Sequence, residues 1–169
     1  IGEVWENAAD KIAYGKRRRY FRGRQLDSVM NYPLKDGIIR YIQTENASEL
    51  LHCIRVLINH YPKETLDCLM NILGTHDTER IISALAAKPM GDLDNDALAL
   101  MFMTEDEKAR GRALVRLASV LQFTLPGIPC IYYGDEVGME GYRDPFNRGT
   151  YPWGREDVDL LAWYRTLGA

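Results

Sequence analysis

The sequence predicts an α/β fold in which parallel strands alternate with helices. Short apolar runs recur along the chain without polar alternation, which is typical of strands covered on both faces. Stretches with the periodicity of an amphipathic helix separate these runs. With residues 1–5 as the first strand, strand and helix alternate four times, and such alternation means parallel strands joined by right-handed crossovers.

Four strands are predicted at the apolar runs. The first covers residues 1–5, and the second covers residues 26–32 and is closed by Pro33. The third and fourth, residues 67–73 and 129–133, are apolar through their middles. Strands of this kind are expected to be buried on both faces.

Three helices are predicted from apolar spacing and from end signals. Residues 46–61 place Leu50 and Leu57 on one apolar face, and Pro62 ends the helix. A second helix begins at Thr104 and Glu107, a capping box, and extends to residue 124. Gly111 lies inside it, which costs about 1 kcal/mol relative to Ala, so we expect close packing there. Residues 157–167 form the third.

Two parallel architectures fit this order: an open doubly wound sheet and a (β/α)₈ barrel. The doubly wound fold is expected to carry a glycine-rich phosphate loop, and the sequence contains none. Carboxylates and aromatic residues follow the strands instead, as in Glu3, Trp5 and Asp77. A barrel takes about 250 residues, so residues 1–169 are predicted to form a single partial domain, strands 5 to 8 of a barrel.

Four segments resemble the α-amylase superfamily, glycoside hydrolase family 13. In chain order these segments resemble the ends of the family's fifth to eighth strands. They are IGEVW at residues 1–5, DSVMNYP at 27–33, NILGTHDTER at 71–80 and LPGIPCIYYGDEVGM at 125–139. Within the superfamily the sequence of these segments is most similar to that of the neopullulanase, cyclomaltodextrinase and maltogenic amylase group. The segment DPFNR at 144–148 adds to that similarity. The resemblance implies the C-terminal half of a catalytic barrel.

The resemblance also implies roles for individual residues in the retaining hydrolysis of α-glucosidic bonds. Glu3 is then the general acid/base, a role that needs a carboxyl kept protonated by burial or by nearby negative charge. Trp5 offers an apolar wall beside it. Asp77 is the third family carboxylate, which binds sugar hydroxyls, and His76 donates a hydrogen bond to the same sugar.

Other candidate residues leave two interpretations open. Tyr32 either stacks on a sugar face or packs beneath the site, and Arg80 either lines the cleft or pairs with acidic residues. Asp144 and Arg148 resemble a family pair that reaches the sugar, and they also suit a local loop ion pair. Asp135 and Glu136 are expected to be structural groups of their loop. No metal site and no cofactor are predicted.

The resemblance implies a nucleophile aspartate on the fourth strand, and no such segment occurs in residues 1–169. The chain has no initiator Met, so we expect it to be cut from a longer protein. Removing one member of a catalytic unit abolishes the covalent route, so the chain alone is expected to be inactive. The unpaired edges of half a barrel predict a homo-oligomer.

Charge and composition exclude other partners. A net charge of −3 gives no reason to expect nucleic acid or an anionic membrane, and no apolar stretch is long enough to span a bilayer. The basic run at residues 16–19 is predicted to be an exposed helix face rather than a binding patch. Cys53, Cys68 and Cys130 fit buried free thiols, which favours a cytoplasmic protein.

The expected substrate is therefore an α-glucan oligosaccharide, and two alternatives of other kinds stay open. A glucan transglycosylase or branching enzyme shares the same covalent intermediate and differs only in the acceptor. A non-catalytic scaffold or binding protein with an amylase-like barrel is the other. Such scaffolds generally lose the catalytic carboxylates, whereas Glu3 and Asp77 are both present.

Overall fold

The computed structural model describes all residues from 1 to 169. The chain divides into two compact units. The first unit consists of Ile1–Ile72 and Gln122–Cys130, and the second of Leu73–Leu121 and Ile131–Ala169.

A small parallel sheet organises the first unit. Gly2 pairs with Val29, and Met30 pairs with Met70, each through an isolated parallel bridge. Strand β3 (Met70–Asn71) then pairs in parallel with β4 (Ile128–Pro129). The four predicted strand segments are thus neighbours in chain order, which is the order expected for consecutive strands of a barrel. The regular strands are shorter than predicted, at two residues each.

Helix α1 (Tyr32–Thr44) begins where the sequence analysis placed the end of a strand. Pro33 was interpreted there as a terminator, but it lies in the first turn of α1, where its missing N–H is not needed. The Asn31 side chain caps this end by accepting a hydrogen bond from the Leu34 N–H at 3.3 Å. Residue 32 is therefore the start of a helix that was not predicted.

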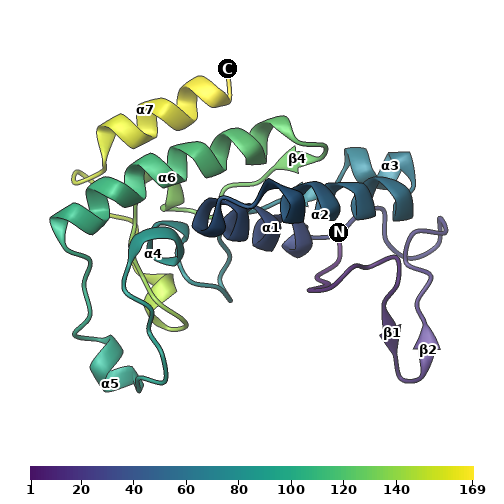
Figure 1. Ribbon diagram of the computed structural model, residues 1–169, viewed down its shortest axis with the longest axis horizontal. Helices are drawn as coiled ribbons and strands as arrows, with labels where there is room; N and C mark the ends of the chain where they lie inside the picture. The colour runs from purple at the N-terminus through teal and green to yellow at the C-terminus, as the bar shows by residue number, and fades with distance from the viewer. The chain divides into compact units, whose positions relative to one another are not determined.

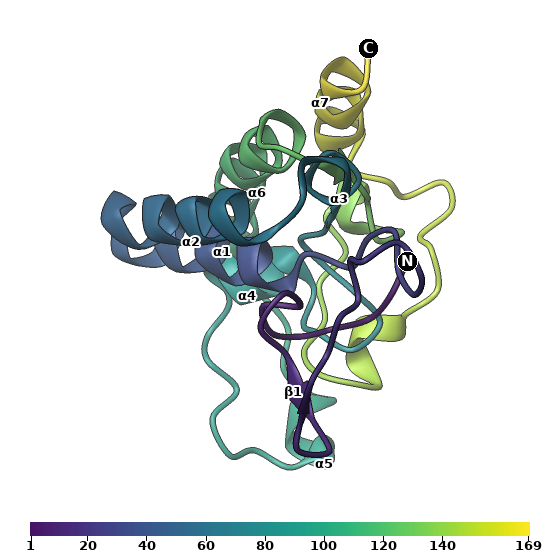
Figure 2. The same cartoon turned by 90° about the vertical axis from the view of Figure 1, so that its right-hand side faces the viewer.

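Helix α2 (Ala47–His60) confirms the predicted helix at residues 46–61. The Asn46 side chain caps it by accepting from the Ser48 N–H at 3.1 Å. Its buried residues Leu50 and Leu57 belong to the predicted apolar face, and α1 and α2 lie side by side in both views (Figures 1 and 2). The short α3 (Lys63–Asp67) follows.

A hairpin precedes these helices and was not predicted. Strands β1 (Ile12–Ala13) and β2 (Lys16–Arg17) pair antiparallel, and the hairpin extends away from α1 and α2 in Figure 1. Tyr14 and Gly15 make the turn, with φ of 53° and 69°. The expectation that residues 16–19 form a helix face is wrong, because this basic run begins in β2.

The second unit is mostly helical. Reciprocal hydrogen bonds confirm the predicted capping box: the Thr104 N–H donates to Glu107 Oε2 at 2.7 Å, and the Glu107 N–H donates to Thr104 Oγ1 at 3.2 Å. The unit contains the elements α4 (Ile81–Ala86), α5 (Asn95–Leu98), most of α6 (Glu105–Thr124), η1 (Asp135–Val137), η2 (Phe146–Arg148) and α7 (Val158–Leu167).

Close packing at Gly111 is confirmed. A Cβ at this position would lie 2.5 Å from Ile82 Cγ1 of α4, which is far below van der Waals contact. Helix α7 confirms the last predicted helix, and the Asp157 side chain caps it by accepting from the Leu160 N–H at 2.9 Å. Leu160 is fully buried, so the apolar stripe faces the interior of the unit.

The three cysteines are free, as predicted. Cys53 and Cys130 are partly buried, but Cys68 is exposed, so the expectation of burial is wrong for that residue. The cytoplasmic location inferred from these thiols stays a prediction. None of the helices is both long enough and apolar enough to cross a bilayer.

Candidate active site

In the first unit Glu3 directly follows Gly2, which pairs with Val29 in the second predicted strand. Its carboxylate Oε1 accepts a hydrogen bond from the Tyr32 hydroxyl at 3.0 Å. The Trp5 ring stacks on the Tyr32 ring, with centroids 4.3 Å apart and planes 14° from parallel. Tyr32 therefore holds both the proposed acid and the aromatic wall beside it.

Burial separates the two interpretations of Tyr32. Its side chain is only 1% exposed, so it packs beneath the candidate site and has no free face for a sugar. Trp5 is 50% exposed and keeps one face accessible. Glu3 is exposed rather than buried. The burial that the sequence analysis expected around the general acid is therefore not present within residues 1–169.

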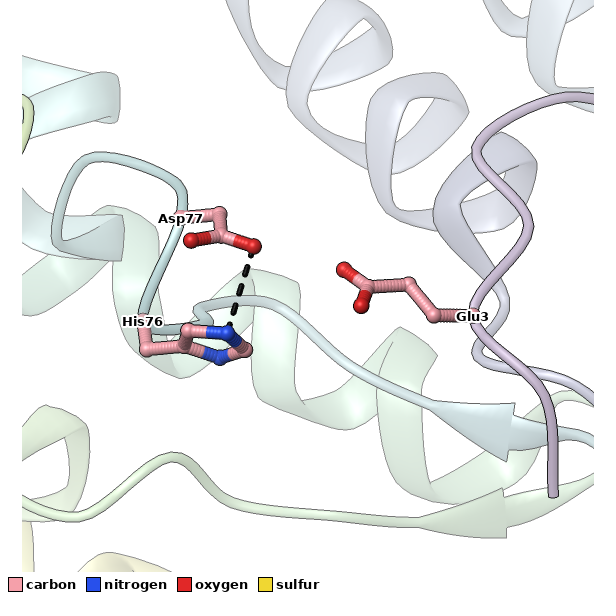
Figure 3. Close-up of side chains that lie close together, drawn as sticks. All are labelled: Glu3, His76 and Asp77. Carbon is pink, nitrogen blue, oxygen red and sulfur yellow. Dashed lines mark ion pairs between the residues drawn. The ribbon is translucent and has the colours of Figure 1, made fainter.

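In the second unit the loop after β3 carries His76 and Asp77. The Thr75 N–H donates to Thr78 Oγ1 at 3.1 Å, and the Asp77 N–H donates to Thr75 Oγ1 at 3.2 Å. His76 Nε2 lies 3.2 Å from Asp77 Oδ2, an ion pair drawn as the dashed line in Figure 3. The turn therefore fixes the backbone of Asp77 and places the imidazole against its carboxylate.

Arg148 joins this loop to the segment at residues 144–148. Its Nη2 lies 3.3 Å from Asp77 Oδ1, and its Nε donates to the His76 carbonyl at 3.0 Å. The same Nε lies 3.0 Å from Asp144 Oδ1. The local ion pair of the sequence analysis is present, and it is also in contact with the candidate site residues Asp77 and His76.

Asn147 is a positioning residue that the sequence analysis missed. It is fully buried, and its Nδ2 donates to the carbonyls of His76 and Thr78, both at 2.8 Å. Two backbone carbonyls of the loop are thereby tied to η2. Its place in the segment at residues 144–148 was the available signal, but backbone acceptors cannot be identified from a sequence.

Arg80 does not line a cleft: its side chain is 0% exposed. It lies 3.3 Å from Asp135, also buried, and donates to the Tyr133 carbonyl. Its guanidinium group lies over the rings of Tyr132 and Tyr133, 4.3 and 4.6 Å from their centroids. Of the two interpretations of Arg80, the structure supports pairing with an acid.

The structural interpretation of the loop acids is also supported. Asp135 packs against the backbone of Gly74, where a Cβ would lie 2.2 Å from Asp135 Oδ2. The Glu136 carboxylate accepts from the Gly134 N–H at 2.7 Å. The buried contacts of Arg80, Asp135 and Gly74 therefore join the segment after β3 to the segment after β4.

Stability is expected to fall as pH rises because of Asp135. Burial raises the pKa of Asp135 to about 7, against the opposing effect of the Arg80 guanidinium. An unfolded Asp has a pKa of about 4, so between about pH 4 and pH 7 the folded state keeps a proton that the unfolded state has lost. The free energy of unfolding therefore declines through this range.

Chemical denaturation of the complete protein at pH 5 and at pH 8 measures this decline. The variant Asp135→Asn is expected to show a smaller decline, because its side chain does not titrate. The matched control Asp92→Asn removes an exposed carboxyl and should keep the wild-type decline. An Asp135→Asn protein with the wild-type pH dependence would contradict the assignment.

The fold and the residues at the strand ends together define a class of protein. The parallel strand segments are neighbours in chain order, with α1 to α3 between the second and third and α4 to α6 between the third and fourth, an arrangement typical of part of a (β/α)₈ barrel. Glu3, Asn31 and Leu73 each follow a strand at the carboxyl edge of the sheet, the edge on which such barrels carry their active sites.

A family profile described as "Alpha amylase, catalytic domain" matches residues 1–160. The chain belongs to the α-amylase catalytic domain family, and its fold is a fragment of the (β/α)₈ barrel of that family. The resemblance found in the four sequence segments is confirmed.

Relatives of known name are similar over almost the whole chain. An amylopullulanase of Thermoanaerobacter thermohydrosulfuricus is 34% identical, covering 99% of this chain and 11% of its own length. A cyclomaltodextrinase of Geobacillus thermopakistaniensis is also 34% identical, covering 92% of this chain and 21% of its own. The chain thus spans at most about a quarter of the length of such relatives.

Solved structures agree with the assignment. The cyclic α-maltosyl-(1→6)-maltose hydrolase of Arthrobacter globiformis superposes with a TM-score of 0.73 at 28% identity, covering 98% of this chain and 31% of that chain. A cyclomaltodextrinase superposes with a TM-score of 0.70 at 30% identity, covering 98% of this chain and 24% of that chain.

Proposed function

We propose that residues 1–169 supply the acid/base side of the active site of a retaining α-glucan hydrolase. The observation that carries the proposal is the parallel order of the strand segments, with Glu3 directly after the first and His76 and Asp77 in the loop after the third. The resemblance of these segments to the family supports placing these strand ends at the rim where such barrels carry their active sites. The exposed carboxylates and the half-exposed Trp5 ring suit a sugar ligand.

Glu3 is the proposed general acid/base. Retaining hydrolysis needs one carboxyl group to protonate the departing oxygen and later to deprotonate water. The hydrogen bond from Tyr32 fixes the direction of the Glu3 carboxylate, and the Trp5 face next to it can contact a sugar ring. These contacts orient the proton donor before substrate arrives, and orientation of this kind lowers the entropic part of the barrier.

Asp77 is the proposed carboxylate that binds sugar hydroxyls and favours the oxocarbenium-like transition state. Each of its two oxygens already has a partner, since Arg148 and His76 lie at 3.3 and 3.2 Å. Such contacts fix the orientation of the carboxylate. His76, Asp144 and Arg148 form the proposed polar wall of the same subsite.

The proposed substrates are α-glucan oligosaccharides, including cyclodextrins and pullulan. Relatives at 30% identity or more carry the names amylopullulanase, cyclomaltodextrinase and maltogenic α-amylase. Hydrolysis is favoured over transfer because those names, and that of the Arthrobacter neighbour, describe hydrolytic enzymes. Product analysis of the complete protein with maltotriose, with and without added glucose as acceptor, tests this choice, and predominant transfer products would contradict it.

The 169-residue chain alone is expected to be inactive. It contains no counterpart of the family's nucleophile segment, and loss of one member of a catalytic unit removes nearly all of the covalent route. Incubation with maltotriose, pullulan and β-cyclodextrin checks this expectation. Turnover at the rate of the complete protein would show that the nucleophile is supplied from within residues 1–169.

The isolated chain is also expected to self-associate. The segment at Gly2 and strand β4 lie at the two ends of the parallel sheet, so each presents backbone groups without a strand partner, and unpaired edges recruit other strands. Light scattering should therefore give at least twice the chain mass of 19.3 kDa. A folded monomer at that mass would contradict the expectation.

A further inference from the structure

The basic run at residues 16–19 is not used by the proposed catalytic function, and the structure places it at a cavity. The cavity lies in the first unit beside the β1–β2 hairpin and has a volume of about 670 Å³. That volume is within the range of ligand sites in proteins. Its walls come from the hairpin, the following loop and the end of α2, and include Tyr20, Phe21 and His60.

The lining is strongly basic. Four arginines face the cavity and only one carboxylate, that of Asp10, so the formal charge is +3 with His60 neutral; the arginines are Arg17, Arg18, Arg19 and Arg22. The whole chain, in contrast, carries −3. The positive charge is therefore concentrated in this cavity and is not a general property of the surface.

The carboxylate of Asp10, the only one in the lining, already pairs with two other lining residues. Asp10 Oδ1 lies 2.7 Å from Arg17 Nη2, and Asp10 Oδ2 lies 2.6 Å from His60 Nδ1. Arg18, Arg19 and Arg22 make no ion pair with any carboxylate of the chain. Guanidinium groups this close in sequence repel one another, and a bound anion would offset that repulsion.

Arg18 is an anchored residue of the cavity lining. Its Nε is buried and has no hydrogen-bond partner. Its backbone N–H donates to the Lys11 carbonyl at 2.8 Å, and its guanidinium lies 5.4 Å from the centre of the Tyr14 ring. These contacts hold the Arg18 side chain in place at the wall of the cavity.

We propose that this cavity binds a phosphate group, either as inorganic phosphate or as a phosphate monoester. An arginine guanidinium can donate two parallel hydrogen bonds to two oxygens of one phosphate. A phosphate dianion also neutralises more of the +3 charge than a carboxylate does. The Tyr20 and Phe21 rings in the lining offer apolar surface to a group esterified to the phosphate, such as a sugar. The site is distinct from the residues that we assign to glucan hydrolysis.

Calorimetric titration of the complete protein at fixed ionic strength tests the proposal, with inorganic phosphate, glucose 6-phosphate and glucose as probes. We expect inorganic phosphate to bind with a Kd below about 1 mM and glucose not to bind in this cavity. Tighter binding of glucose 6-phosphate would identify a sugar phosphate as the ligand, and equal binding would identify free phosphate. Absence of binding by both phosphates would overturn the proposal.

Substitutions distinguish a specific phosphate site from general attraction to a positively charged surface. Arg18→Gln and Arg19→Gln should each weaken phosphate binding at least about tenfold, and Arg18→Lys should also weaken it, because lysine keeps the charge but loses the planar fork. The control Arg24→Gln removes an exposed arginine outside the lining and should leave the Kd unchanged. Equal weakening in Arg24→Gln, or unchanged binding in Arg18→Lys and Arg18→Gln, would show that no specific site exists.

Discussion

Glu3→Gln is expected to lower kcat on maltotriose by about 10²–10⁴-fold, the usual contribution of a general acid. Glutamine has nearly the same shape and can still accept the Tyr32 hydrogen bond, so the fold around residue 3 should remain. The loss follows because the side chain no longer carries a proton for the departing oxygen. Steady-state kinetics of the complete protein measure it.

A substrate with a better leaving group sharpens this test. Fluoride departs without protonation, so in Glu3→Gln the kcat/KM for release of fluoride from α-maltosyl fluoride should fall much less than the kcat/KM for maltotriose. Glu6→Gln is the matched control, because Glu6 lies three residues away, is exposed and pairs only with Lys11. Equal losses of kcat/KM on both substrates would contradict the role of Glu3 as the acid.

Asp77→Asn is expected to lower kcat/KM by about 10²–10³-fold on maltotriose and on α-maltosyl fluoride alike. A neutral amide stabilises developing positive charge on the sugar less well than a carboxylate does. It also weakens the pairing with Arg148 and His76. The two substrates therefore distinguish Asp77 from Glu3 by the pattern of losses.

The control for this variant is Asp92→Asn, which removes an exposed carboxyl distant in sequence from the loop after β3. Its kinetics should match those of the wild type. If Asp77→Asn kept full activity on maltotriose, or lost activity only on maltotriose, the proposed role of Asp77 would be wrong.

Elements with strong local signals could be predicted from the sequence. Helix α6 has its capping box at Thr104 and Glu107, and α2 has its apolar face. Helix α1 was missed because Pro33 terminates a strand and begins a helix equally well. The β1–β2 hairpin was missed because Tyr14 takes a positive φ, which is uncommon for a residue of that size.

The candidate site was predictable in its residue types and less so in its contacts. Glu3 and Asp77 were found from segments that resemble a family, and the family is confirmed. The sequence left two roles open for Tyr32 and Arg80, because side-chain direction at a strand end depends on what covers it. Burial of both residues supports packing roles for each.

The proposed function requires Glu3 and Asp77 to act on the same sugar. A crystal structure of the complete protein with Glu3→Gln and an intact maltooligosaccharide tests this most directly. We expect the residue 3 side chain within hydrogen-bond reach of a glycosidic oxygen, about 2.6–3.2 Å, and the Asp77 carboxylate bonded to hydroxyls of the adjoining sugar ring. An oligosaccharide bound elsewhere, or one that touches only one of the two side chains, would contradict the proposed function.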